Sequence, residues 1–127
     1  NDTVAAVQDG LVPRSSGDQG LPRFTWWPHK GSWEWITRRL DEPKRISAVE
    51  VYWFDDTGLG GCSVPEACRV QWWDGADWRD VSPNAAVGVE KDRFNRLVFE
   101  PVETTRVRLD VKLRHGYSGG IWEWRVE

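Results

Sequence analysis

The strictest pattern in the sequence is the alternation over residues 106–113, RVRLDVKL. Apolar residues occupy every second position, and charged residues fill the positions between them. Because successive side chains of a β-strand point to opposite faces of a sheet, this period of two predicts a strand with one buried face. The predicted core positions are Val107, Leu109, Val111 and Leu113.

Further strands are predicted where short segments are rich in β-branched and aromatic residues and are separated by Gly, Pro, Asn or Asp. These segments are residues 46–54, 68–74, 77–81, 95–102 and 119–127. Residues 74–78, DGADW, predict a tight hairpin in which Gly75 adopts a positive φ. The sequence therefore indicates an all-β fold, an antiparallel sandwich or barrel. Residues 1–127 are expected to form a single domain.

The closing segment, GGIWEWRVE, also alternates. Its period of two places Trp122, Trp124 and Val126 on one face and Ile121, Glu123 and Arg125 on the other. We therefore expect a last strand with one polar face.

The charge distribution argues against some classes of binding partner. Seventeen basic and twenty acidic side chains are interspersed and give a formal net charge of −3. Such a chain is not expected to bind nucleic acid or an anionic membrane. No apolar run approaches the roughly 20 residues of a membrane span, and no basic-then-apolar leader begins the chain. Any export signal is expected to lie outside these residues, in a longer parent protein.

The two cysteines, Cys62 and Cys68, enclose a short loop. Two thiols without supporting histidines do not make a four-ligand zinc site. Two alternatives stay open: a small disulfide in an exported protein, or two buried small residues.

Four segments, taken in order, resemble the discoidin-like domains, also called coagulation-factor C-type domains. They read SWEWITRRLDEPKRISAVEVYW, CRVQWWDGADWRDV, NRLVFEPVETTRVRLDV and GGIWEWRVE. The resemblance implies an antiparallel β-sandwich of jelly-roll type with about eight strands. It also implies a carbohydrate-binding module, since the family includes the family 32 modules of bacterial glycoside hydrolases.

A closer resemblance rests on PRFTWWPHKGSWEW and VEVYWFDDTGLGGCSVP. These segments are similar to domains at the C-terminal end of bacterial β-L-arabinofuranosidase-like proteins of the DUF1680 type. The resemblance implies a non-catalytic, monomeric module of a secreted, periplasmic or cell-surface glycoside hydrolase. Its expected ligand is an arabinose- or galactose-containing plant polysaccharide.

One departure from the family pattern concerns charge near the core. Where the family usually has aspartate before a strand-ending leucine, this chain has Arg39 before Leu40. Arg38 falls on the face that Ile36 and Leu40 share. An arginine there needs a partner or a path to solvent.

The resemblance also implies a structural calcium ion near the first loop and the last strand. Asp9 matches the family's Asp-Gly position and Glu123 its terminal glutamate, and Ser16, Asp18 and Thr25 offer further oxygens. Calcium binds six to eight oxygen ligands. The loop is longer than is usual in the family, and the alternative is that Asp9 caps a turn while Glu123 pairs with a surface arginine.

Nine of the ten tryptophans divide into core and surface candidates. Those within strand patterns are expected to be buried or partly buried: Trp35, Trp53, Trp72, Trp78, Trp122 and Trp124. Those that flank the Pro-His-Lys-Gly turn are the better surface candidates: Trp26, Trp27 and Trp33. An exposed indole offers a platform for the apolar face of a sugar.

The resemblance implies that residues 15–31, 55–67 and 114–120 converge at one end of the sandwich, where the predicted sugar site lies. The candidate ligand-binding residues are Trp26, Trp27, His29, Asp55, Asp56, Arg114, His115 and Tyr117. Together they supply aromatic faces, carboxylates, and hydrogen-bond donors.

Three other functions are weighed against sugar binding. A catalytic role is disfavoured because Asp55 and Asp56 are neighbours on one loop, whereas glycosidases place two carboxyl groups across a cleft. A protein- or lipid-binding adhesion module stays an alternative, although its membrane-inserting form is disfavoured because loop 55–67 is acidic and glycine-rich. An accessory domain that only packs on the catalytic domain of its parent stays an alternative.

Overall fold

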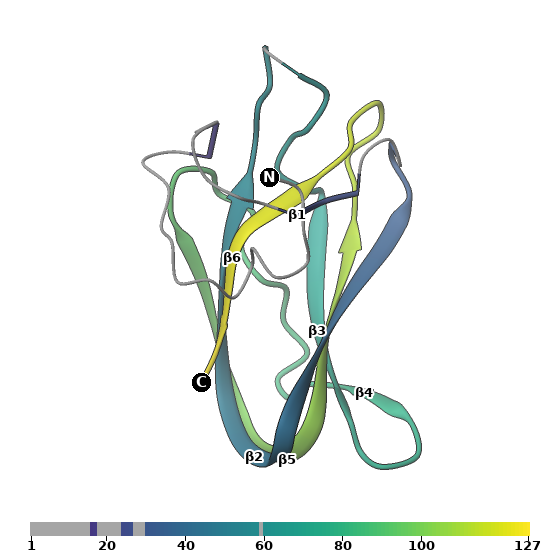
Figure 1. Ribbon diagram of the computed structural model, residues 1–127, viewed down its shortest axis with the longest axis vertical. Coiled ribbons are helices and arrows are strands. Elements are labelled where there is room, and N and C mark those ends of the chain that lie inside the picture. The colour runs from purple at the N-terminus through teal and green to yellow at the C-terminus, as the bar shows by residue number, and fades with distance from the viewer. Residues whose placement is uncertain (1–15, 18–23, 27–29, 59) are drawn as a thin grey trace.

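The computed structural model describes residues 16–17, 24–26, 30–58 and 60–127. These residues form six strands and no helix: β1 (Phe24–Thr25), β2 (Trp33–Phe54), β3 (Ala67–Trp73), β4 (Trp78–Asp80), β5 (Phe94–Lys112) and β6 (Gly120–Val126). All the strand pairings are antiparallel, in the order β1-β6-β2-β5-β3-β4 (Figure 1). The described residues therefore contain no helix that could cross a membrane.

The long strands β2 and β5 bend back on themselves and so build two layers (Figure 1). In layer one, β2 residues 33–39 pair with β5 residues 106–112, and β3 and β4 follow at its edge. In layer two, the second half of β2 pairs with the first half of β5 and with β6. The register shifts at the bends enclose Pro43 and Pro101, and proline suits such places because it lacks a ladder N–H.

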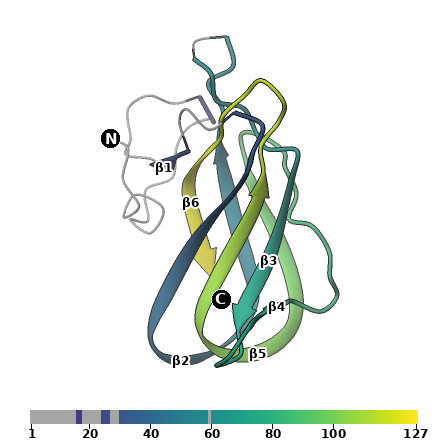
Figure 2. The same cartoon turned by 90° about the vertical axis from the view of Figure 1, so that its right-hand side faces the viewer.

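The predicted β-sandwich is therefore confirmed. When each half of the two long strands is counted separately, the six strands amount to eight strand segments, the number implied by the family resemblance. Figure 2 looks onto layer one, where β2, β5 and β3 run side by side.

The core lies between the layers and is built as the alternation predicted. Val107, Leu109, Val111 and Leu113 are all fully buried. Trp53 and Trp124 contribute large rings from layer two to the same cluster. Burying apolar surface is the main favourable term in folding, so this alternation determines which face of β5 points inward.

The prediction for the last strand is wrong in register. Trp53 pairs with Ile121 and Tyr52 with Glu123, so Trp122 is an extra residue in a β-bulge. Trp124 and Ile121 consequently lie in the main core, whereas Trp122 packs in a second cluster with a ring-centroid distance of 5.4 Å to Phe54. The predicted polar face is present only in part, because Glu123 is buried whereas Arg125 is partly exposed and pairs with Glu50.

Several tryptophans lie elsewhere than predicted. Trp35 is 60% exposed rather than buried, since it lies on the outer face of layer one. Trp33, on the same face, is exposed as predicted. Trp26 is buried rather than exposed, because it packs edge-on against Phe24 and its Nε1 donates to the Trp35 carbonyl at 3.3 Å. Trp27 lies outside the described residues.

The predicted hairpin between β3 and β4 is confirmed. Gly75 has a φ of 101°. One carboxylate oxygen of Asp74 accepts hydrogen bonds from the amides of Asp77 and Ala76, and the other accepts one from Arg79. These bonds lower the pKa of Asp74 to about 2.

Both cysteines are buried free thiols. They lie in different apolar clusters, Cys62 in the second and Cys68 in the main core. Burial raises the pKa of the Cys68 thiol well above its usual range. The structure therefore corresponds to the second alternative, two buried small residues.

Candidate functional site

The described parts of the three loops expected to converge do meet at one end of the sandwich, at the top of Figure 1. The amide of Gly31 donates to the Tyr117 carbonyl at 3.0 Å, and the amide of Ser118 donates to the Gly61 carbonyl at 2.8 Å. The amide of Asp55 donates to the Ser16 carbonyl at 2.9 Å. Backbone bonds of this kind hold the described parts of the loops in one arrangement, so their side chains share one surface.

A four-residue turn, Arg114–Tyr117, presents the exposed side chains of Arg114 and His115 at this end. The amide of Tyr117 donates to the Arg114 carbonyl at 3.0 Å, and Gly116 at the third position has a φ of 80°. A positive φ at that position is the signature of a type II turn, and glycine adopts it without strain. His115 therefore lies at the tip of the turn, exposed to solvent.

Arg114 is held in place beside the turn. Its guanidinium lies 5.5 Å from the centroid of the Tyr117 ring, and its Nη1 donates to the Ser63 hydroxyl at 3.2 Å. Three predicted residues, Arg114, His115 and Tyr117, are thus brought together with a part of the 55–67 loop.

A shallow hollow of about 490 Å³ lies beside this turn. Its lining residues are Val64, Pro65, Glu66, Val89, Arg114 and His115. Among these the sequence predicted only Arg114 and His115 as site residues. It missed Val64, Pro65 and Glu66 within the predicted loop 55–67, and Val89, which comes from a fourth loop. The hollow joins an apolar floor to an imidazole, a guanidinium and a carboxylate, which between them donate and accept hydrogen bonds.

Asp55 is a structural residue of the loop. Its carboxylate is buried, with Oδ1 accepting from the amide of Thr57 and Oδ2 from that of Val64, both at 3.0 Å. Burial alone would raise the pKa of Asp55, but the hydrogen bonds from Thr57 and Val64 and the charge of Lys91 lower it overall. Both oxygens of Asp55 thus accept from loop amides, and its contact with ligand hydroxyls stays a prediction.

Asp56 and the described part of residues 15–31 contribute less to the predicted sugar site than the sequence indicated. Asp56 Oδ1 accepts from the amide of Cys62 at 2.8 Å, so this half-buried carboxylate also serves the loop. The buried Trp26 forms no platform at the surface. Trp27 and His29 lie outside the described residues, and their role stays a prediction.

The predicted calcium ligands are only partly described. Asp9 and Asp18 lie outside the described residues, which contain no cluster of three metal-binding side chains. The Ser16 hydroxyl accepts from the amide of Asp92 at 2.6 Å, and Glu123 is a buried carboxylate on β6. Of the predicted calcium ligands that the structure describes, Glu123 is the one with a carboxylate. The fit of calcium therefore depends on Asp9 and Asp18.

Comparison with known proteins identifies relatives by structure alone. No protein-family model matches the sequence, and no curated protein does so. A structure of the Streptococcus pneumoniae β-galactosidase BgaA superposes with a TM-score of 0.81 at 18% identity, over 98% of this chain and 84% of that one. The family 32 carbohydrate-binding module of Clostridium perfringens NanJ, in complex with galactose, gives 0.71 at 12% identity, over 98% and 84%. The module CpGH89CBM32-5 from Clostridium perfringens, in complex with GalNAc-β-1,3-galactose, gives 0.70 at 17%, over 99% and 84%.

The chain has the fold of a carbohydrate-binding module. At identities of 12–18% the likeness establishes the fold and leaves the ligand to be argued from the residues.

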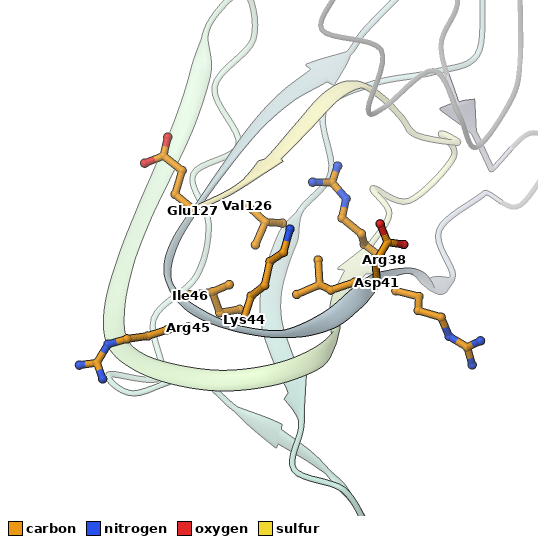
Figure 3. A pocket seen from close by; sticks show the side chains of 9 residues that line it. Arg38, Asp41, Lys44, Arg45, Ile46, Val126 and Glu127 are labelled. Atoms are coloured by element: carbon orange, nitrogen blue, oxygen red, sulfur yellow. The ribbon is translucent and has the colours of Figure 1, made fainter.

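A second hollow in this chain lies where β2 bends, at the end opposite the loops (Figure 3). It measures about 500 Å³, and Arg38, Lys44, Val126 and Glu127 are among its lining residues. Arg45, at the same bend, also lines this hollow (Figure 3). Arg38 donates to the Trp124 carbonyl and lies near the charge of Glu123, which is how the core accommodates the arginine noted in the sequence.

Proposed function

We propose that the chain is a non-catalytic carbohydrate-binding module whose loop end holds the sugar. The hollow beside the Arg114–Tyr117 turn carries this proposal. There the exposed Arg114 and His115, together with Glu66, surround an apolar floor. Sugars present apolar C–H faces and rings of hydroxyls, so a site for them combines an apolar surface with hydrogen-bonding groups.

The same loops support a role in binding rather than catalysis. Hydrolysis of a glycoside needs two carboxyl groups roughly 5–9.5 Å apart on either side of the scissile bond. Asp55 and Asp56 are instead engaged by loop amides. What they contribute is a fixed backbone beneath the hollow, and such pre-organisation lowers the entropic cost of binding.

The ligand class that we propose is a galactose- or arabinose-containing glycan of plant type. Two structural neighbours are described as bound to galactose or to a galactose-containing disaccharide. We also propose that the module belongs to a secreted, periplasmic or cell-surface glycoside hydrolase and directs it to polysaccharide. The likeness to BgaA, which is named a β-galactosidase, supports this context.

Tryptophan fluorescence of the chain, titrated with galactose, arabinose and their oligosaccharides, tests the proposal. We expect a saturable change that His115→Ala and Arg114→Ala each weaken about tenfold, because each removes a hydrogen-bonding group worth about 1.4 kcal/mol. Val98→Ala is the matched control, since Val98 is 60% exposed on another face. Silence with every sugar, in a folded chain, contradicts the proposal.

We further propose a structural calcium ion bound by Asp9, Ser16, Asp18, Thr25 and Glu123. Among the described residues, the buried carboxylate of Glu123 supports this calcium site. When bound, the ion would tie the first loop to the last strand. Thermal melting with calcium and then with a chelator tests this, and we expect a higher melting temperature with calcium that Asp9→Asn and Glu123→Gln abolish. An equal melting temperature in both conditions excludes the site.

A further inference from the structure

The outer face of layer one carries exposed tryptophans that neither the core nor the loop end uses. Trp33 and Trp35 are 53% and 60% exposed, and they stand two residues apart on β2, on one face. At the rise of a strand this spacing separates them by about 6.7 Å along the strand. Among the described residues only Val98 is another large apolar side chain so exposed, and it stands alone on layer two.

The strands beside these tryptophans supply charge on the same face. Residues directly opposite one another in a sheet point to the same side, so Trp33 stands beside Lys112, Trp35 beside Asp110, and Arg39 beside Arg106. On β3, Arg69 stands beside Asp110 and Gln71 beside Arg108.

These polar side chains are held in place. Arg69 binds Asp110 Oδ2 through two nitrogens at 2.9 and 2.7 Å, and Arg108 donates to Gln71 Oε1 at 3.1 and 2.5 Å. Arginines also lie against the rings: Arg69 is 5.5 Å from the centroid of the Trp33 ring. A surface ordered in this way loses little conformational entropy when it binds a partner.

The charge on this face is opposite in sign to that of the whole chain. Its basic side chains are Arg39, Arg69, Arg106, Arg108 and Lys112, and its carboxylates are Asp80 and Asp110. The excess is basic, whereas the chain carries a net charge of −3. Such a face favours an anionic occupant over a neutral one.

We propose that this outer face is a second binding surface, which takes an extended polysaccharide bearing carboxylates. Sugar rings would lie on the indoles of Trp33 and Trp35, while their carboxylates pair with arginines such as Arg39, the pairing that a guanidinium fork favours. Figure 2 shows that the face is an open sheet surface running from the loop end, where Trp33 and Lys112 lie, towards the bend, and such a surface suits a long chain more than a single sugar unit. This second surface does not depend on the loop-end site of the proposed function.

Affinity electrophoresis in gels containing polygalacturonate, or its fully methyl-esterified form, tests the proposal. We expect the acidic polymer to retard the wild-type chain, added salt to weaken the retardation, and the neutral ester to have little effect. Trp35→Ala and Arg39→Gln should each weaken binding about tenfold or more, as truncations of central aromatic and arginine contacts do.

Three matched variants make the result specific. Val98→Ala removes another exposed apolar side chain, and Arg45→Gln removes the same charge as Arg39→Gln but outside the paired rows of this face. His115→Ala alters the loop end. All three should bind the acidic polymer as the wild type does.

Several outcomes overturn the proposal. These are no retardation of the wild type, equal retardation of Trp35→Ala, loss of retardation in His115→Ala instead, or equal binding of the ester. Self-association that Trp35→Ala abolishes, without binding to either polymer, overturns it in favour of a protein interface. The galactose titration is read separately, so failure of the loop-end site and failure of this surface remain distinguishable.

Discussion

The guanidinium carbon of Arg38 lies 4.8 Å from the centroid of the Trp124 ring, and the same side chain donates a hydrogen bond to the Trp124 carbonyl. Burial lowers the pKa of Arg38 to about 10, while the charge of Glu123 opposes the shift. A charged residue on the inner side of β2 is thus compensated by a ring, a carbonyl and a carboxylate, all from β6.

Replacing Arg38 should therefore destabilise the fold, because Glu123 would lose a compensating positive charge. We expect Arg38→Met to lower the free energy of unfolding by about 3–5 kcal/mol, because it leaves a buried carboxylate without its compensating cation. The double variant Arg38→Met/Glu123→Gln should recover a large part of that loss. Urea denaturation of the two single variants and the double variant measures the coupling. A double variant less stable than either single one would contradict this account.

Asp55 is expected to stabilise the loop end in a pH-dependent way. Asp55→Asn should cost about 1–3 kcal/mol, since an amide cannot accept from both Thr57 and Val64 as the carboxylate does. The pKa of Asp55 is lower in the folded state, so its contribution is present above the unfolded-state pKa and is lost as the pH falls through the folded one.

Denaturation of the wild type and Asp55→Asn from pH 7 to pH 2 measures this effect. The difference in stability between them should shrink below about pH 4. Asp41→Asn, at the exposed bend of β2, serves as the control and should show little difference at any pH. A difference that grows on acidification would refute the assignment.

The tryptophans provide a test of the two-layer core. Trp53 is fully buried and its Nε1 donates to the Gly88 carbonyl at 2.8 Å, so Trp53→Ala should cost about 3–5 kcal/mol. Trp35→Ala, on the outer face, should change stability by less than about 0.5 kcal/mol. Equilibrium denaturation compares the two, and equal losses would show that the outer face is part of a packed interface in solution.

The sequence predicted those parts of the fold that depend on a regular period. Val107, Leu109 and Val111 alternate with charged residues, and their burial on one face of β5 follows directly from that period. The sandwich and its converging loops were predicted from the order of the segments and the family resemblance that this order carries. Short antiparallel strands with polar turns have few ways to pack, which is why the order is informative.

Features that interrupt a period could not be predicted in this way. The bulge at Trp122 turns its ring from the main core to the second cluster, although the letters WEW keep a strict alternation. The period of two places Trp35 and Ile36 on opposite faces of the sheet, but the sequence does not show that the face of Trp35 is exposed to solvent. The inward-facing oxygens of Asp55 follow from the path of the loop through Val64, which composition does not reveal.

Gly116 links the geometry of the turn to the proposed site. Its φ of 80° is one that residues with a Cβ rarely adopt, although no neighbouring atom lies within 4 Å of the place where a Cβ would be. Gly116→Ala should thus cost about 1 kcal/mol from backbone strain alone, and it should weaken galactose binding by moving His115. Gly116→Asn should recover part of both losses, because asparagine tolerates this conformation. Thermal melting and the galactose titration of the two variants measure these effects.

Gly75 offers a matched control for that variant. It has a φ of 101°, and again no atom lies within 4 Å of the place that a Cβ would occupy, but it belongs to the β3–β4 hairpin. Gly75→Ala should lower the melting temperature to a similar extent and leave the galactose titration unchanged. If both alanine variants weaken galactose binding equally, the effect comes from general destabilisation, and the turn at His115 does not position the ligand.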